Sequence, residues 1–318
     1  MFAYSVRRIL TTIPLLLVAL YLVYIGVSVT TDPLAEFRLC LPRCQEGYDR
    51  IVELYNLEQS VFVRPFGWAA DAVTGDFGTS NVAGQPVSTV LWERGINSAM
   101  IAVPAFLLAA VLALLLSVYS ARRQYSAGDY VLTGLSFLGI AFPAFVLGLV
   151  LQVIFAIKLP EWTGWKLFYT GGKRNDNIGE IIGTVTLPVV TLATLFVAAD
   201  SRFGRAAMLE VINSDFIRTA RAKGLSERRV IWRHALRNAL IPLVTLWALN
   251  FSALLGGSVI TESVFSWPGL GQILIPALQR PDLDMVMGIV IFTAIITVVF
   301  NLLADLLYGV LDPRIRYD

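Results

Sequence analysis

Few residues in this chain have the chemistry of an active or metal site. Cys40 and Cys44 are its two cysteines, and His234 is its one histidine. A zinc site usually needs three or four such ligands, so a His/Cys metal cluster is not expected. Gly171-Gly172-Lys173 resembles part of a phosphate-binding loop, but it lacks the first glycine at the required offset and the hydroxyl residue after the lysine. No cofactor is therefore expected on this chain, and if ATP is used, another chain must bind it.

The most informative polar segment is residues 204–238. Ser214 is a plausible N-cap, and Gly224 suits the left-handed residue that ends a helix. These signals predict a short helix from Asp215 to Lys223. A helix of this length is marginal in water, so it must dock onto something.

Two apolar residues indicate how that short helix docks. Phe216 and Ala220 are spaced to share one face, and Arg218 and Arg221 surround it. This is the pattern of a helix that lies in a groove with a charged rim. An alternative is attraction of the basic patch to anionic lipid headgroups.

The elements around this segment are apolar enough to cross a membrane. The chain is 56% hydrophobic and 15% charged, whereas soluble domains carry about 25% charged residues. A spanning helix needs about 20 apolar residues. Pro143 predicts a kink in the third span. The first span is too long for a signal peptide, and no small-x-small cleavage pattern follows it. The sequence predicts an all-α membrane protein of six transmembrane helices, near 9–30, 97–120, 130–157, 181–203, 239–261 and 286–310.

The distribution of basic residues predicts the orientation. With the N-terminus inside, the inner segments hold 15 of the 25 Lys and Arg residues. Both termini are therefore expected in the cytoplasm. The expected divisions are a first helix, a small extracytoplasmic cap, a five-helix core and a cytoplasmic tail, at 1–30, 31–96, 97–310 and 311–318.

The two cysteines fall in the expected cap. Paired thiols outside the cytoplasm tend to form disulfides, and Pro42 between them indicates that the chain doubles back. A disulfide between Cys40 and Cys44 is the favoured interpretation, and two unpaired thiols are the alternative.

Polar residues inside the predicted spans are candidates for a translocation path. Such groups usually face a cavity or a helix interface. Hydrogen bonds between helices are an equally good explanation of them. The candidates are Thr191 and Thr194 in the fourth span and Asn250 and Ser252 in the fifth.

The segments around these elements resemble a known family. Arg218-Thr219-Ala220-Arg221-Ala222-Lys223-Gly224-Leu225-Ser226 looks like the cytoplasmic loop of ABC importer permeases. The similarity is narrower to the B-type permease of oligopeptide, dipeptide and nickel importers. The general importer motif begins Glu-Ala-Ala, where this chain has Arg218, Thr219 and Ala220, and that departure is typical of the peptide branch. Further matching segments are Phe2–Pro14, Gly75–Gly78, Gly84–Val87, Arg233–Pro242, Ser266–Gly271, Asp305–Tyr308 and Leu311–Arg314.

The resemblance implies one subunit of a larger machine with the type I importer permease fold in a bacterial cytoplasmic membrane. Its partners would be a second homologous permease, two cytoplasmic ATPases that bind ATP and magnesium, and an extracytoplasmic substrate-binding protein. Residues 215–226 would be the coupling helix, which transmits ATPase closure. The residues expected to contact the ATPase are Asp215, Phe216, Arg218, Thr219, Ala220, Arg221 and Gly224.

Peptides are the expected cargo of such a permease. Nickel chelates, glutathione and other small solutes are alternatives within the same machinery. An ion-coupled secondary transporter usually needs acidic groups near the membrane midplane, whereas Asp200, Asp305 and Glu262 lie near span ends. An intramembrane enzyme would need a nucleophile–base pair that one loop histidine cannot supply. No nucleic acid partner is indicated.

Overall fold

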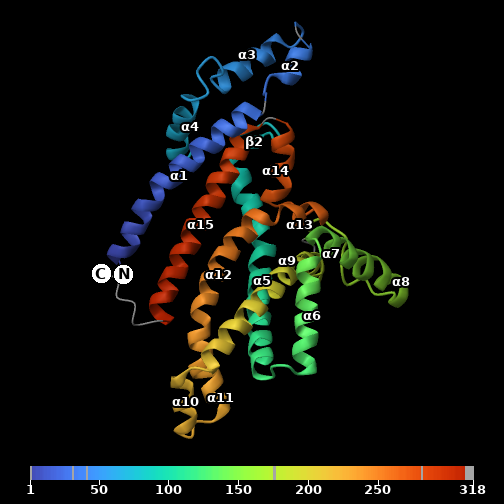
Figure 1. The fold of residues 1–318 in the computed structure, drawn as a ribbon. Coiled ribbons are helices and arrows are strands. Elements are labelled where there is room, and N and C mark those ends of the chain that lie inside the picture. Colours follow the sequence, from blue (N-terminus) through green and yellow to red (C-terminus); the bar gives the residue numbers. More distant parts are fainter. Residues whose placement is uncertain (1, 31, 41, 175–176, 281, 312–318) are drawn as a thin grey trace.

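Long helices dominate the fold, with a group of short helices at one end (Figure 1). The computed structural model describes residues 2–30, 32–40, 42–174, 177–280 and 282–311. The predicted tail 311–318 lies outside these residues except for Leu311. The long helices are α1 (Phe2–Thr30), α5 (Val87–Arg122), α9 (Ile178–Ile212), α12 (Leu236–Gly257) and α15 (Leu283–Leu311).

Five segments of the described chain are long and apolar enough to cross a membrane. They are Leu10–Thr30, Val87–Arg122, Ala144–Thr163, Ile178–Ile212 and Leu283–Leu303. The predicted fifth span corresponds to α12, whose 22 residues also suffice in length. Several side chains of α12 lie outside the described part of the structure. The helical membrane class is confirmed, and the count of six spans stays a prediction.

The predicted third span is broken in two at Pro143. It comprises α6 (Ala127–Ala141), α7 (Ala144–Leu151), the π-helix η1 (Gln152–Lys158) and α8 (Leu159–Thr163). Phe142 has an extended ψ of 124°, the conformation that a following proline imposes. The predicted kink is confirmed as a complete break between α6 and α7.

Small residues let α5 and α9 pack closely against each other. Ala102, Ala105 and Ala109 of α5 and Ala193 of α9 are buried in one apolar cluster. Without bulky side chains between them, two membrane helices gain close van der Waals contact. The cluster continues to α12 through Phe251. These helices therefore form the central support of the fold.

The short helices and a small hairpin form a cap, defined here as residues 32–86. Tyr55 of the cap packs with Tyr24 of α1 and with Leu283 and Met287 of α15, and burial raises the pKa of the Tyr55 hydroxyl. Figure 1 shows the cap beside the upper end of α1. Its elements are α2 (Ala35–Cys40), α3 (Gln45–Leu54), α4 (Arg64–Val73), β1 (Thr79–Ser80) and β2 (Gln85–Pro86).

The boundary between cap and core differs from the sequence prediction. Helix α5 begins at Val87 rather than near 97. Glu93 and Arg94 interrupt the apolar run, but Val87 and Leu91 are buried against α14 (Leu270–Gln279) and α15. Packing on one face thus extends the helix beyond its most apolar part.

The predicted disulfide is confirmed, since Cys40 and Cys44 are bonded with their Cα atoms 5.6 Å apart. The bond joins the end of α2 to the N-cap position of α3.

Removing this disulfide is expected to affect only the cap. We expect a Cys40→Ser/Cys44→Ser variant to lower the free energy of local unfolding of α2 and α3 by about 2 kcal/mol. This is the chain-entropy value for such a short loop. Limited proteolysis should then cut the cap faster, while the chain still folds and inserts. Equal cleavage rates in variant and native protein would contradict a stabilising role. Comparing peptide masses with and without reduction checks the bond itself.

Candidate functional site

The loop between α9 and α12 carries α10 (Asp215–Ala222) at the end of the molecule opposite the cap (Figure 1). Ser214 occupies the predicted N-cap position. Its hydroxyl does not cap the helix, however, because Oγ donates to the Val211 carbonyl at 2.6 Å. Asp215 lies in the first turn, where its charge complements the helix dipole.

The end of α10 has the geometry that the sequence predicts. Gly224 has a φ of +74°, in the left-handed region. This conformation lets the Gly224 amide donate to the Arg221 carbonyl at 2.9 Å, which closes the last turn. The chain then continues through α11 (Glu227–Arg229) and the π-helix η2 (Val230–Ala235) into α12.

One face of α10 is buried against the protein itself. Ile217 is fully buried and Ala220 is 8% exposed. They pack with Met208 of α9, Val118 of α5 and Val230 of η2. The sequence placed Ala220 beside Phe216 on a face for a partner, and this is wrong: Ala220 faces the core of its own chain.

The opposite face of α10 is exposed and mixed in character. The Phe216 side chain is 46% exposed, although it is large and apolar. Arg218 pairs with Asp215 at 3.3 Å, and Arg221 pairs with Glu227 at 2.7 Å. Such exposed ion pairs add little stability. Phe216, Arg218, Thr219 and Arg221 are therefore available for contact with another molecule. We call these four residues the exposed face of α10.

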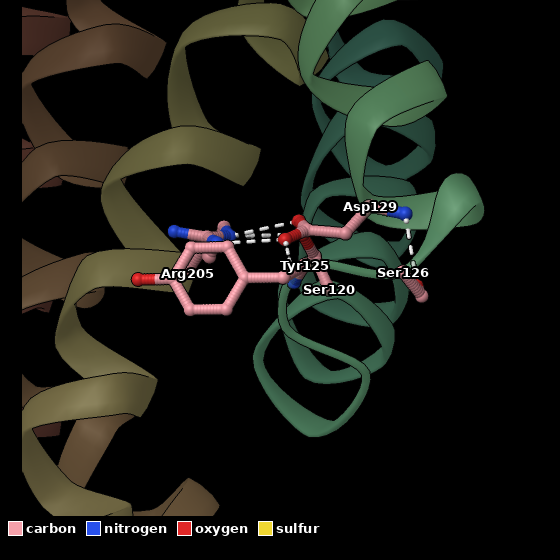
Figure 2. Close-up of polar contacts among 5 residues, drawn as sticks. All are labelled: Ser120, Tyr125, Ser126, Asp129 and Arg205. Atoms are coloured by element: carbon pink, nitrogen blue, oxygen red, sulfur yellow. Dashed lines mark hydrogen bonds and ion pairs between the residues drawn. The ribbon is translucent and has the colours of Figure 1, made fainter.

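An ion pair between a buried aspartate and a partly buried arginine lies where α5, α6 and α9 meet (Figure 2). Arg205 of α9 donates from Nε to Asp129 Oδ1 at 2.9 Å and from Nη2 to Oδ2 at 2.8 Å. Ser120 Oγ and the Tyr125 amide also donate to the Asp129 carboxylate. The Ser126 hydroxyl caps α6 by accepting from the Asp129 amide at 3.2 Å. We call these five residues the Asp129 cluster.

The threonines proposed for a translocation path bond to their own helix. Thr191 is fully buried and donates to the Leu187 carbonyl at 2.8 Å. Thr194 is partly buried and donates to the Val190 carbonyl at 2.7 Å. Such bonds satisfy a hydroxyl within an apolar helix. The geometry around these two hydroxyls does not indicate a path.

The translocation-path candidates on α12 are Asn250 and Ser252, and Asn250, unlike the two threonines, bonds to another helix. Asn250 donates from Nδ2 to Asp200 Oδ1 of α9 at 2.9 Å, so it joins two helices. The side chain of Ser252 lies outside the described residues. The bond to Asp200 thus accounts for a polar Asn250 inside the helix bundle, with no need for a role in translocation. The role of Ser252 stays a prediction.

A buried carboxylate, absent from the predicted site, lies toward the cap end of the helices. Glu262 of α13 (Val259–Val264) is fully buried. Its Oε1 accepts from Ser98 Oγ and Ser258 Oγ, both at 2.7 Å. Its Oε2 accepts from the amides of Gly271 at 2.8 Å and Gln272 at 3.1 Å. Glu262 thereby holds the first turn of α14 against α5.

The segment Ser266–Gly271 is shaped around this carboxylate. A Cβ on Gly269 would collide with the Glu262 carboxyl group, and one on Gly271 would lie 2.5 Å from Val259 Cα. Trp267 donates from Nε1 to the Asn97 carbonyl at 2.8 Å. The close approach explains why this segment of the sequence is rich in glycine.

The described residues contain no group of three or more His, Cys, Asp or Glu side chains placed to hold a metal ion. The long apolar helices are those of a helical membrane protein, which carries a disulfide-bonded cap at one end and the loop helix α10 at the other. The family model described as "Binding-protein-dependent transport system inner membrane component" matches residues 113–317. The chain belongs to this family of membrane transport components.

Similar proteins cover the whole chain. The oligopeptide transport system permease protein AppB of Bacillus subtilis is 38% identical over all of both chains. The oligopeptide transport system permease protein OppB of Mycobacterium tuberculosis is 36% identical over 98% of each chain. The glutathione transport system permease protein GsiC of Escherichia coli is 32% identical, again over all of both chains.

Two solved structures share the fold. An amino acid ABC transporter chain has a TM-score of 0.52 at 15% identity, and a chain of the inward-facing MetNI methionine ABC transporter has 0.52 at 16%. Each match covers 70% of this chain and 94% of the other chain. The likeness confirms the predicted type I importer permease fold.

Proposed function

We propose that this chain is a permease subunit of an ATP-driven peptide importer and forms half of its translocation pathway. The observation that carries the proposal is the similarity to oligopeptide permeases along the entire chain. The partners would be a second homologous permease, two cytoplasmic ATPase subunits or domains and an extracytoplasmic substrate-binding protein. ATP and magnesium would bind to the ATPases, and this chain would be no enzyme.

The exposed face of α10 is the proposed contact with an ATPase. Its Phe216 offers an apolar anchor, and Arg218 and Arg221 surround that anchor with charge. The helix is held to its own chain by Ile217 and Ala220, so a force on the exposed face would reach the spanning helices.

The proposed orientation places α10 and both termini in the cytoplasm of a bacterium and the cap outside. The excess of basic residues in the segments on the α10 side supports it. The Cys40–Cys44 disulfide supports it independently, because such bonds persist in oxidising compartments.

Transport by the purified, reconstituted complex tests the function. Proteoliposomes would contain this chain with the three kinds of partner, ATP and magnesium on the ATPase side, and a radiolabelled pentapeptide with the binding protein on the other side. We expect the peptide to accumulate with ATP and not with a non-hydrolysable analogue. Accumulation that follows a proton or sodium gradient without ATP would refute the proposal.

Glutathione is the second candidate substrate, because the GsiC permeases also match along the whole chain. Competition distinguishes the two. Unlabelled glutathione in excess should leave pentapeptide uptake unchanged if oligopeptides are the cargo. ATP-dependent uptake of glutathione without any uptake of the pentapeptide would favour the second candidate.

The left-handed residue after α10 provides a prediction about coupling. In Gly224→Val we expect a β-branched side chain to disfavour the φ of +74° by about 1–2 kcal/mol and to shift the end of the helix. Peptide uptake should fall several-fold while the complex still assembles. Gly224→Asn is the matched control, because asparagine tolerates this conformation and should retain most uptake. Normal peptide uptake together with normal substrate-stimulated ATP hydrolysis in the valine variant would contradict the prediction.

A further inference from the structure

The Asp129 cluster is a polar link between α6 and α9, the helix that leads to α10. Arg205 lies on α9, which continues unbroken to Ile212, and α10 begins at Asp215. The Asp129 side chain is 4% exposed and that of Arg205 is 26% exposed. Figure 2 shows the two side chains facing each other between α9 and α6.

A buried ion pair of this kind fixes positions more than it adds stability. Apolar side chains of similar size often stabilise a protein as well as a buried pair does, because desolvation offsets the attraction. The two parallel bonds between Arg205 and Asp129, however, permit one relative geometry. Tyr125 adopts a φ of +62°, an uncommon conformation for a non-glycine residue, and aims its amide at Asp129. Strain at such a residue is typical of places where position matters.

The other helices near α10 need no such link. Ile217 of α10 packs directly on Met208 of α9 and Val118 of α5, so these helices share an apolar core with it. Helix α6 packs along α9, with Arg202 over the Phe137 ring, and is bonded to it at this end through the Asp129 cluster. Further along, Ser136 of α6 and Ser201 of α9 have their Oγ atoms 3.3 Å apart.

The contacts of the third span change at its break. Beyond Phe142 and Pro143, Gln152 of η1 donates to the carbonyls of Thr170 and Val264, which belong to the other end of the fold. Both parts of the span pack on α9, but only the second part also packs on α13 and bonds to this other end of the fold. The extended Phe142 and the missing amide hydrogen of Pro143 interrupt the helical hydrogen-bond ladder between the two parts, which weakens resistance to bending there.

We propose that Asp129 and Arg205 are positioning residues that make α6 move as one body with α9 and α10 during transport, while the third span bends at Phe142–Pro143. This rests on the proposed function. A displacement of α10 by an ATPase would then reach α6 through the ion pair, and α7 would stay with the opposite end. Without the pair, α9 and α10 would move and α6 would lag.

A covalent lock between α6 and α9 tests the proposal. Ser136→Cys and Ser201→Cys, made in a Cys40→Ser/Cys44→Ser background, place two thiols at the 3.3 Å contact. After oxidation with copper phenanthroline in the reconstituted complex, we expect pentapeptide uptake within about twofold of the reduced form, since the two helices need no relative motion. Loss of uptake on oxidation, restored by reduction, would overturn the proposal. Failure of the thiols to bond would contradict the contact on which it rests.

The ion pair itself is tested with Asp129→Asn and the milder Arg205→Lys. We expect assembled complexes with unchanged ATP hydrolysis in the absence of binding protein, and with peptide uptake per ATP lowered about tenfold. The disulfide lock should restore uptake to either variant, which a merely structural defect would not allow. Glu210→Gln, at an exposed carboxylate further along α9, is the matched control and should behave like the native protein. Unchanged uptake per ATP in both variants, or no rescue by the lock, would refute the inference. Absence of ATP-dependent uptake by the native complex would instead refute the proposed function.

Discussion

Truncating Ile217 to alanine is expected to uncouple ATP hydrolysis from transport. Ile217 is fully buried between α10 and the ends of α5 and α9. Removing its outer methyl groups should weaken the docking of α10 by about 2–5 kcal/mol, the cost of such truncations in packed cores. Because 1.4 kcal/mol is about a tenfold change in an equilibrium, α10 would leave its position often enough to transmit little force. Pentapeptide uptake per ATP, measured in proteoliposomes, should fall at least about tenfold.

The neighbouring residue provides the control. Phe216 is 46% exposed, so Phe216→Ala should change the stability of the chain by no more than about 0.5 kcal/mol. It should instead weaken binding of the ATPase, because exposed aromatic anchors contribute strongly to interfaces. Thermal unfolding of the isolated chain in detergent and co-purification of the ATPase separate the two effects. Equal effects of both substitutions on unfolding would contradict the assignment of the two faces.

Residues at the two ends of α10 made the helix predictable from the sequence. Which face of the helix is buried could not be predicted, because it depends on packing against distant parts of the chain. Asp215 and Gly224 mark the ends of α10 through dipole and left-handed geometry, which act within a few residues. Phe216 and Ala220 have the right spacing for one shared face, yet Ile217 proved to be the buried anchor. A short helix has several apolar residues, and only its neighbours in space decide which of them are covered.

Hydropathy located the long apolar helices but not all of their ends, since α9 also continues to Ile212, beyond the predicted end at 203. Pro143 broke the third span as expected, because its effect on Phe142 is steric and local. The start of α5 at Val87 was missed, since Glu93 and Arg94 lower the apolar average of a stretch that is buried on one side. The Asp129 cluster and the hydrogen bonds of Glu262 were missed for another reason. Their partners are 76 residues apart for Arg205 and Asp129 and 164 apart for Ser98 and Glu262.

Replacing Glu262 with alanine is expected to have the largest effect on folding of the substitutions considered. The change would leave two hydroxyl groups and two amides without their acceptor in a fully buried place. Each hydrogen bond to a charged group contributes about 1.5–3 kcal/mol, and an unsatisfied buried donor costs about 1–3 kcal/mol. The first turn of α14 should therefore detach from α5, and the yield of folded chain extracted from membranes should fall strongly. Size-exclusion chromatography in mild detergent measures that yield.

Glu262→Gln separates the loss of acceptors from the loss of volume. A glutamine fills the same space but replaces one accepting oxygen with an amide that donates. If Oε2 is the group replaced, the amides of Gly271 and Gln272 lose their acceptor, whereas Ser98 and Ser258 can rotate their hydroxyl groups to adapt. We therefore expect the one side-chain oxygen of the glutamine to face the two backbone amides and its NH₂ group to face the two serine hydroxyl groups. The variant should fold at a yield between those of the native and alanine proteins. Proteolysis within 258–272 should become faster in the same order. A glutamine variant as poor as the alanine variant would mean that the charge of Glu262, rather than its acceptor geometry, holds α14 in place.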